Sequence, residues 1–282
     1  MKKRLFSFIK YSFSCSFVSF VLNNLVMTSL HYLDPNPSGN PTVLLLHGLG
    51  ADGTSWSLQL PALSQAGFRP LAPDAPGFGG SPYDGGGWNI RRVAGQMAGL
   101  LEELGSGPAH VVGLSMGGVI AQQFALDFPQ LTKKLVLVST FSVLRPQDLS
   151  GWAYFLRRAA SFLVQGPVAQ AQVVARRVFP DPKDQPLREM YLAIVAHADP
   201  RAYRQAMAAL GLFDSSKRLR EISVPTLVVT GADDSTVSPA RQKFLADGIP
   251  GARQVIIPNG GHAVSVDQSQ QFNRALLEFL QE

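Results

Sequence analysis

After Met27 the chain alternates short apolar runs with segments of helical period, and this alternation is the feature that most constrains its fold. Six of the runs are rich in Val, Leu or Ile without polar alternation, which is typical of strands buried on both faces. They are Thr42 to Leu46, Phe68 to Ala72, His110 to Gly113, Lys134 to Val138, Thr226 to Thr230 and Gln254 to Ile257. The sequence therefore predicts an α/β fold, in which a mostly parallel sheet carries helices on both faces.

Helical periodicity fills several of the intervals between these runs. Asn89 to Leu104 starts with a capping residue type and is closed by Gly105. Met116 to Phe128 is stopped by a proline, and Val266 to Leu280 predicts a terminal helix.

One segment, residues 142–220, breaks the alternation because it holds helical patterns but no strand-like run. Its predicted helices are Trp152 to Leu163, Pro186 to Ala198 and Ala202 to Leu210, divided by Gly and Pro. Compact domains rarely hold so long a structureless connection. We therefore expect a helical cap inserted into a core that is formed by residues 27–141 and 221–282.

The first 26 residues begin with basic side chains and continue into an aromatic, Ser-rich apolar run, similar to a signal peptide or a membrane anchor. The match is poor, because Lys10 interrupts the run, Asn23 and Asn24 lie inside it, and no small-residue cleavage site follows. We expect an N-terminal extension without a structural role in a cytoplasmic protein. Anchoring to a membrane or export through this segment is the alternative.

Charge and cysteine content exclude several classes of function. Four of the 25 basic residues lie in that leading segment, which leaves 21 basic against 20 acidic residues and a net charge of +1. We therefore expect no nucleic-acid partner. The single cysteine, Cys15, cannot form an intramolecular disulfide, and no Cys/His cluster has the spacing of metal ligands, so neither a metal nor an organic cofactor is expected.

A serine stands between small residues in the run from Gly113 to Gly117, directly after a predicted buried strand and before a predicted helix. In this context Ser115 would lie on a sharp strand-to-helix turn that exposes its hydroxyl. A G-x-S-x-G string arises easily in a chain so rich in Gly and Ser. Its place between strand and helix therefore carries the prediction that Ser115 is a nucleophile.

A serine hydroxyl needs a base, and the base needs an orienting acid. Among the five histidines, His262 follows the last predicted strand in a Gly-Gly-His loop, at the same sheet edge as Ser115. Asp233 and Asp234 follow the fifth predicted strand, where an aspartate can orient the base or cap a turn. Along the chain these candidates come in the order Ser, Asp, His.

An oxyanion that forms during attack on a carbonyl needs two preorganised N–H donors. The backbone N–H of Met116 follows the nucleophile directly, and that of Leu49 lies in the turn after the first predicted strand. His47, in the same turn, is expected to fix the loop rather than to act in catalysis.

Five runs together, LLLHGLG, DAPGFGGS, VVGLSMGGVIAQQFA, VVTGADDSTVSP and PNGGHAV, resemble the α/β-hydrolase superfamily, in its branch of serine esterases, enol-lactonases and cofactor-free haloperoxidases. The resemblance extends from Leu30 to the C-terminus and implies the α/β-hydrolase fold. It also implies that the acid is Asp234, the fourth residue of a G-x-x-D run, and that the turn from Asp74 to Ser81 is structural. The cap is the least similar part.

The expected function is hydrolysis of a small carboxylic ester or lactone through an acyl-enzyme, with Ser115, Asp234 and His262 as catalytic residues. Acyl transfer or perhydrolysis on the same residues is one alternative. Another is a ligand-binding receptor of the same fold, which would turn over slowly but be strongly stabilised by its ligand. The substrate pocket is expected at Trp56, Phe141, Trp152 and Val264, an apolar set that favours neutral substrates if Arg157 and Arg158 stay solvated.

Overall fold

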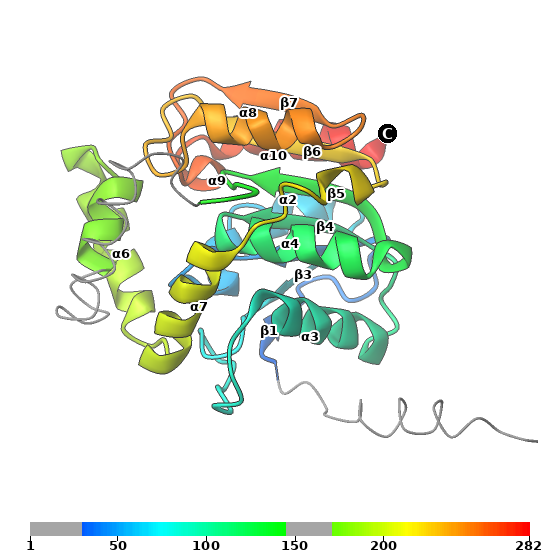
Figure 1. Cartoon of the computed structure of the whole chain (residues 1–282), viewed down its shortest axis with the longest axis horizontal. Coiled ribbons are helices and arrows are strands. Elements are labelled where there is room, and N and C mark those ends of the chain that lie inside the picture. Colours follow the sequence, from blue (N-terminus) through cyan, green and yellow to red (C-terminus); the bar gives the residue numbers. More distant parts are fainter. Residues whose placement is uncertain (1–29, 145–170) are drawn as a thin grey trace, which may run out of the picture.

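The structure is a computed structural model that describes residues 30–144 and 171–282. Seven strands form one sheet in the order β1-β3-β2-β4-β5-β6-β7 (Figure 1). β1 (Tyr32–Leu33) pairs antiparallel with β3, and all other neighbouring strands are parallel. The parallel strands are β2 (Thr42–Leu46), β3 (Arg69–Pro73), β4 (Ala109–Leu114), β5 (Thr132–Val138), β6 (Thr226–Gly231) and β7 (Arg253–Ile257).

Helices cover both faces of the sheet, because successive strand residues point to opposite sides. Leu44 and Leu46 of β2 belong to the core cluster that includes residues of α3 (Ile90–Glu103), α4 (Met116–Asp127) and α8 (Pro239–Gly248). Val43 and Leu45 belong to the cluster on the opposite face, with residues of α2 (Leu60–Gln65), α9 (Val264–Asp267) and α10 (Ser269–Gln281). The predicted α/β fold is thereby confirmed. Of the described helices, none is long and apolar enough to cross a bilayer.

Two predicted elements differ from the structure. β7 is an edge strand in which Ile256 is 57% exposed, so it is not buried on both faces. The terminal helix, predicted from Val266 to Leu280, begins earlier as α9 and is interrupted at Gln268, whose φ of −126° and ψ of 41° are not helical. Local periodicity sees neither the sheet edge nor this break, because both depend on how the segments pack.

Between β5 and β6 the chain leaves the sheet. Its described part holds a helix over residues 171–178, the short helix η3 (Pro182–Asp184), α6 (Gln185–Val195) and α7 (Pro200–Leu212), which lie beside one end of the sheet in Figure 1. The predicted helix from Trp152 to Leu163 lies outside the described residues.

The two ends of this segment meet at an isolated antiparallel bridge between Val143 and Asp214. The following short helix, η4 (Leu219–Glu221), already packs on the core, because Leu219 is buried and a Cβ on Gly248 of α8 would meet its side chain. The segment therefore returns to the core before the predicted boundary at residue 220. The remaining short helices are η1 (Gly53–Trp56) and η2 (Pro129–Leu131).

His110 lies near the amino end of β4, whereas Ser115 follows the carboxyl end of the same strand. The burial of His110 makes the stability of the fold depend on pH. Burial, together with the Lys134 and Lys133 ammonium groups, lowers the pKa of His110 from 6.5 to about 4. Between pH 6.5 and about pH 4 this histidine is protonated in the unfolded chain but neutral in the folded chain. The free energy of unfolding therefore decreases as the pH falls through this window. In thermal unfolding, His110→Leu should lose less stability than wild type between about pH 7 and about pH 4.5. The matched control is His197→Leu at an exposed histidine; equal acid sensitivity of wild type and His110→Leu would contradict the assignment.

Candidate active site

Ser115 joins β4 to α4 through a turn that depends on the glycines around it. Its φ of 54° and ψ of −110° lie in a region that costs a non-glycine residue about 1–3 kcal/mol. A Cβ on Gly113 would overlap the carbonyl of Gly117, and a Cβ on Gly117 would overlap the carbonyl of Leu46. The Oγ1 of Thr140 donates a hydrogen bond of 2.8 Å to the Ser115 carbonyl. The small residues of the motif are therefore required by close backbone contacts.

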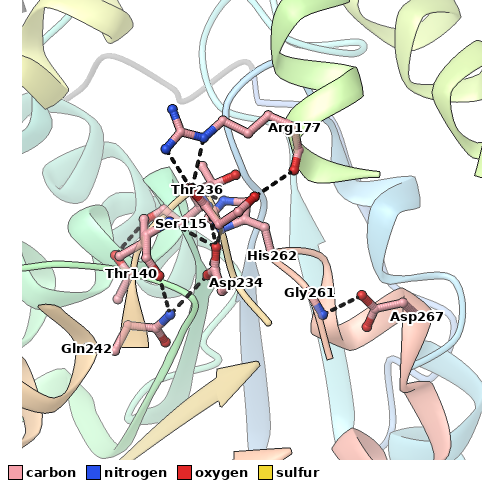
Figure 2. Close-up of polar contacts among 11 residues, drawn as sticks. Ser115, Thr140, Arg177, Asp234, Thr236, Gln242, Gly261, His262 and Asp267 are labelled. Atoms are coloured by element: carbon pink, nitrogen blue, oxygen red, sulfur yellow. Dashed lines mark hydrogen bonds and ion pairs between the residues drawn. The ribbon is translucent and has the colours of Figure 1, made fainter. Parts of the chain in front are cut away.

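Ser115, His262 and Asp234 form a continuous chain of hydrogen bonds at the carboxyl edge of the sheet (Figure 2). The Nε2 of His262 lies 3.0 Å from the Oγ of Ser115, and its Nδ1 lies 3.1 and 3.0 Å from the two carboxylate oxygens of Asp234. A carboxylate only accepts hydrogen bonds, so Nδ1 carries the proton and the Nε2 lone pair faces the hydroxyl. This arrangement can move the hydroxyl proton to the imidazole.

The two adjacent aspartates have different surroundings. Asp234 is buried, and its Oδ1 accepts hydrogen bonds from the backbone N–H groups of Thr236 at 2.8 Å and Val237 at 2.9 Å. Asp233 is exposed, and its backbone N–H donates to the Gly260 carbonyl at 2.8 Å. The structure therefore brings Asp234 rather than Asp233 to the imidazole.

The loop after β2 is held by His47. Its Nε2 accepts a hydrogen bond of 2.9 Å from the Ala75 N–H, so Nδ1 is the protonated nitrogen and donates to the Gly48 carbonyl at 2.8 Å. Burial lowers the pKa of His47, which keeps the ring neutral. These contacts agree with the predicted loop-fixing role.

The two predicted oxyanion donors lie at the turns that flank Ser115. Among the described residues, the N–H groups of Leu49 and Met116 donate no backbone hydrogen bond. The Leu49 carbonyl accepts a hydrogen bond of 3.1 Å from the hydroxyl of Tyr191 in α6. Tyr191 of α6 thus holds the loop by the Leu49 carbonyl and does not engage the Leu49 N–H.

Ser115 and His262 line a cavity of about 1550 Å³ between the carboxyl edge of the sheet and the described helices of residues 171–212. Leu49 and Phe141 line it from the core, and residues of 171–178, α6, α7 and α8 supply most of its remaining described wall. The described lining is largely apolar. Its charged side chains are Arg177, Arg204 and Arg241, and the described lining contains no Asp or Glu.

Two of the predicted pocket residues lie elsewhere, and the prediction for them is wrong. Trp56 is fully buried in the opposite core cluster, with its ring centroid 6.3 Å from that of Phe272. Val264 is fully buried in the same cluster, whereas its sequence neighbours Ala263 and Val266 line the cavity. Phe141 lines the cavity as predicted. Trp152, like Arg157 and Arg158, lies outside the described residues.

Sequence reasoning missed three residues that support the site. Arg177 donates from Nε at 3.0 Å and from Nη2 at 2.6 Å to the carbonyl of Ser235, next to Asp234 (Figure 2). Tyr191 holds the Leu49 loop, and Gln242 contacts Asp234. Nothing local marks them, because each is far from its partner in sequence or has a side chain that is common on helix surfaces.

The chain is similar to known proteins over most of its length. A family model described as alpha/beta hydrolase fold matches residues 41–268. A relative from Variovorax paradoxus with the name "Putative carbamate hydrolase RutD" is 35% identical over 259 residues, which cover 89% of this chain and 96% of the relative.

Two solved structures illustrate the structural similarity. An enol-lactonase from Burkholderia xenovorans superposes with a TM-score of 0.81 at 28% identity, over 90% of this chain and 96% of that chain. A thermophilic esterase from Thermogutta terrifontis superposes with a TM-score of 0.79 at 30% identity, over 89% of this chain and 93% of that chain.

Proposed function

The chain belongs to the α/β-hydrolase fold family, and from this premise we propose that it is a serine hydrolase that cleaves a small carboxylic ester or lactone through an acyl-enzyme. One observation carries the proposal: the His262 ring lies 3.0 Å from the Ser115 hydroxyl on one side and 3.0 Å from the Asp234 carboxylate on the other. Ser115 and His262 also line the cavity that would hold the substrate.

In the first half of the reaction, Ser115 Oγ attacks the substrate carbonyl while its proton passes to His262 Nε2. The imidazolium that forms is stabilised by the ionised Asp234, which already accepts two backbone N–H bonds on Oδ1. The carbonyl oxygen becomes an oxyanion and accepts hydrogen bonds from the N–H groups of Leu49 and Met116. These donors are preorganised by the His47 contacts and by the turn at Ser115.

In the second half, His262 gives its proton to the leaving alcohol, which departs and leaves the acyl group on Ser115. A water molecule then attacks the acyl carbonyl while the same nitrogen takes its proton. Collapse of the second oxyanion releases the acid and restores the serine hydroxyl. In a lactone the alcohol and acyl parts belong to one molecule, so the product is a single hydroxy acid.

The substrate class follows from the cavity wall. The described lining is apolar apart from a few polar groups, and this favours neutral acyl and alcohol parts. Arg177 and Arg241 donate to the carbonyls of Ser235 and Val143, whereas Arg204 is exposed. An anionic substrate is the alternative that these arginines would serve.

Carbamate hydrolysis is a second candidate, because the relative at 35% identity is named for that activity. The same serine attack on a carbamate carbonyl would give a carbamoyl-enzyme instead of an acyl-enzyme. The difference lies in which substituents the cavity accepts and not in the Ser115 chemistry.

A panel of matched substrates tests the proposal. We expect measurable kcat/KM for neutral short-chain esters and lactones and a lower value for carbamates and carboxylate-bearing esters of equal size. The measurement is initial rate on wild type, with Ser115→Ala as the blank for uncatalysed hydrolysis. A preference for carbamates would support the second candidate, and a preference for anionic esters that is lost in Arg204→Gln would contradict the neutral-substrate assignment.

A further inference from the structure

Gln242, in the first turns of α8, is a fully buried polar residue that touches the acid of the site. Its Nε2 donates hydrogen bonds to the Oδ2 of Asp234 at 3.0 Å and to the carbonyl of Val237 at 2.9 Å. Both amide protons are therefore used within the loop that carries the acid (Figure 2). The side chain ties α8 to this loop at the carboxylate itself.

The contacts of Asp234 divide between its two oxygens. Oδ1 accepts from two backbone N–H groups, and Oδ2 accepts from Gln242, while the Nδ1 of His262 lies 3.1 Å from Oδ1 and 3.0 Å from Oδ2. Apart from His262, Gln242 is the side chain among the described residues that donates to this carboxylate. If it were removed, Oδ2 would keep the imidazole contact alone, and apart from that ring the carboxylate would be held on Oδ1 only.

The neutral charge of the amide matters. A hydrogen bond to a carboxylate favours its ionised form. A lysine or arginine would do the same, but its charge would compete with the imidazolium for the carboxylate. No described lysine or arginine forms an ion pair with Asp234. Gln242 thus donates to the carboxylate without bringing a positive charge and leaves the imidazolium as its cationic partner.

We propose that Gln242 is a positioning residue of the hydrolytic site, which orients Asp234 and thereby the His262 ring toward Ser115. The inference rests on the proposed function, because it assigns Gln242 a task in activating the serine. It predicts that Gln242 acts on rate and on pH dependence, and not on substrate affinity, because Gln242 does not line the cavity.

The test measures how fast a fluorophosphonate modifies Ser115, so it does not require the natural substrate. In that reaction the Ser115 oxygen forms a bond to phosphorus, fluoride leaves, and His262 accepts the proton. Gln242→Met keeps the size of the side chain but removes both donors. We expect a loss of about tenfold in the modification rate, and in kcat for an ester, with KM within twofold of wild type.

Gln242→Glu tests the charge argument. Two carboxyl groups in contact do not both ionise, so at low pH the glutamate should share a proton with Asp234 and still donate to it. As the pH rises and this proton is lost, a negative charge replaces the donor, and the modification rate should fall about tenfold relative to wild type. Three other charged residues lie near Asp234 and His262: Asp267, Arg177 and the exposed Asp233. Asp267 accepts a hydrogen bond of 2.8 Å from the Gly261 N–H and is close to Asp184, and Arg177 donates to the Ser235 carbonyl. All of these stay unchanged in the variant.

Gln59 supplies a matched control, because it is also fully buried and also uses Nε2 for two hydrogen bonds, to Ser265 O and Asn273 Oδ1, both at 2.9 Å. Gln59→Met should lower the melting temperature comparably and leave the modification rate and the pH profile within twofold of wild type. The inference is overturned if the fluorophosphonate modifies Ser115 in Gln242→Met at the wild-type rate, or if Gln59→Met lowers the modification rate as much as Gln242→Met does. A wild-type protein whose Ser115 does not react at all would instead contradict the proposed function.

Discussion

Ser115→Ala should lower kcat for an activated ester by roughly ten-thousandfold or more, because no other group can form the acyl bond. The residual rate should be that of water attacking a substrate held in the cavity, with its carbonyl oxygen bound by the two proposed oxyanion donors. The measurement is the initial rate, together with mass spectrometry of the protein after brief exposure to substrate. An acyl adduct is expected on wild type and not on the variant.

Ser139 provides the matched control for this substitution. It is a fully buried serine with φ of 47° after the neighbouring strand β5, and its hydroxyl has no partner among the described residues. Ser139→Ala therefore removes a hydroxyl from a residue of similar φ whose side chain forms no hydrogen bond with His262. Activity within tenfold of wild type in Ser115→Ala, or an equal loss in Ser139→Ala, would disprove the assignment of the nucleophile.

Asp234→Asn should lower kcat by about a thousandfold or more, because it reverses the hydrogen bonding around the imidazole. If the Asn oxygen keeps the Thr236 and Val237 N–H bonds, its NH₂ group replaces Oδ2 and faces the donors of Gln242 and His262. The favoured tautomer then carries the proton on Nε2, where it faces Ser115 and cannot accept the hydroxyl proton. The change also removes the charge that stabilises the imidazolium.

Asp233→Asn is the neighbouring control, since that side chain is exposed and the contact of the residue with Gly260 is made by its backbone. Its kcat should stay within about threefold of wild type, because surface substitutions away from the site usually have small effects. Both variants are compared by kcat, KM and thermal unfolding. The opposite ranking would show that the acid had been placed one residue too late.

The prediction of the fold from the sequence succeeded where the signal is local. β2 matches its predicted bounds, and Asn89 caps α3 by accepting from the Arg92 N–H, because strand burial and helix capping are written in adjacent residues. For β7 the prediction of a strand was right but the expected burial on both faces was wrong, and the break at Gln268 was not predicted. Exposure of an edge strand and interruption of a helix depend on what packs against them.

The pocket shows the same division. Phe141 lies three residues after the end of β5, at the edge of the sheet where Ser115 lies, and this placement was enough to predict that it lines the cavity. Trp56 and Val264 are also apolar and also follow strands that end at this edge, yet both are buried in the core cluster that contains Val43, Leu45 and Phe272. Which way a side chain points from a short helix is set by the rotation of that helix against the sheet, a quantity that composition does not encode.

The sequence by itself determined the parallel α/β sheet and the strand ends from which Ser115, the acid and His262 emerge, because strand burial follows from runs of apolar residues and parallel strands end at one edge. Tertiary structure alone decided that Gln242 and Arg177 hold the acid loop and that three arginines stand in the cavity wall. The Arg177 contact, for example, joins residues that are 58 positions apart along the chain. These contacts form only when the helix of residues 171–178 and α8 pack against the strand ends of the sheet.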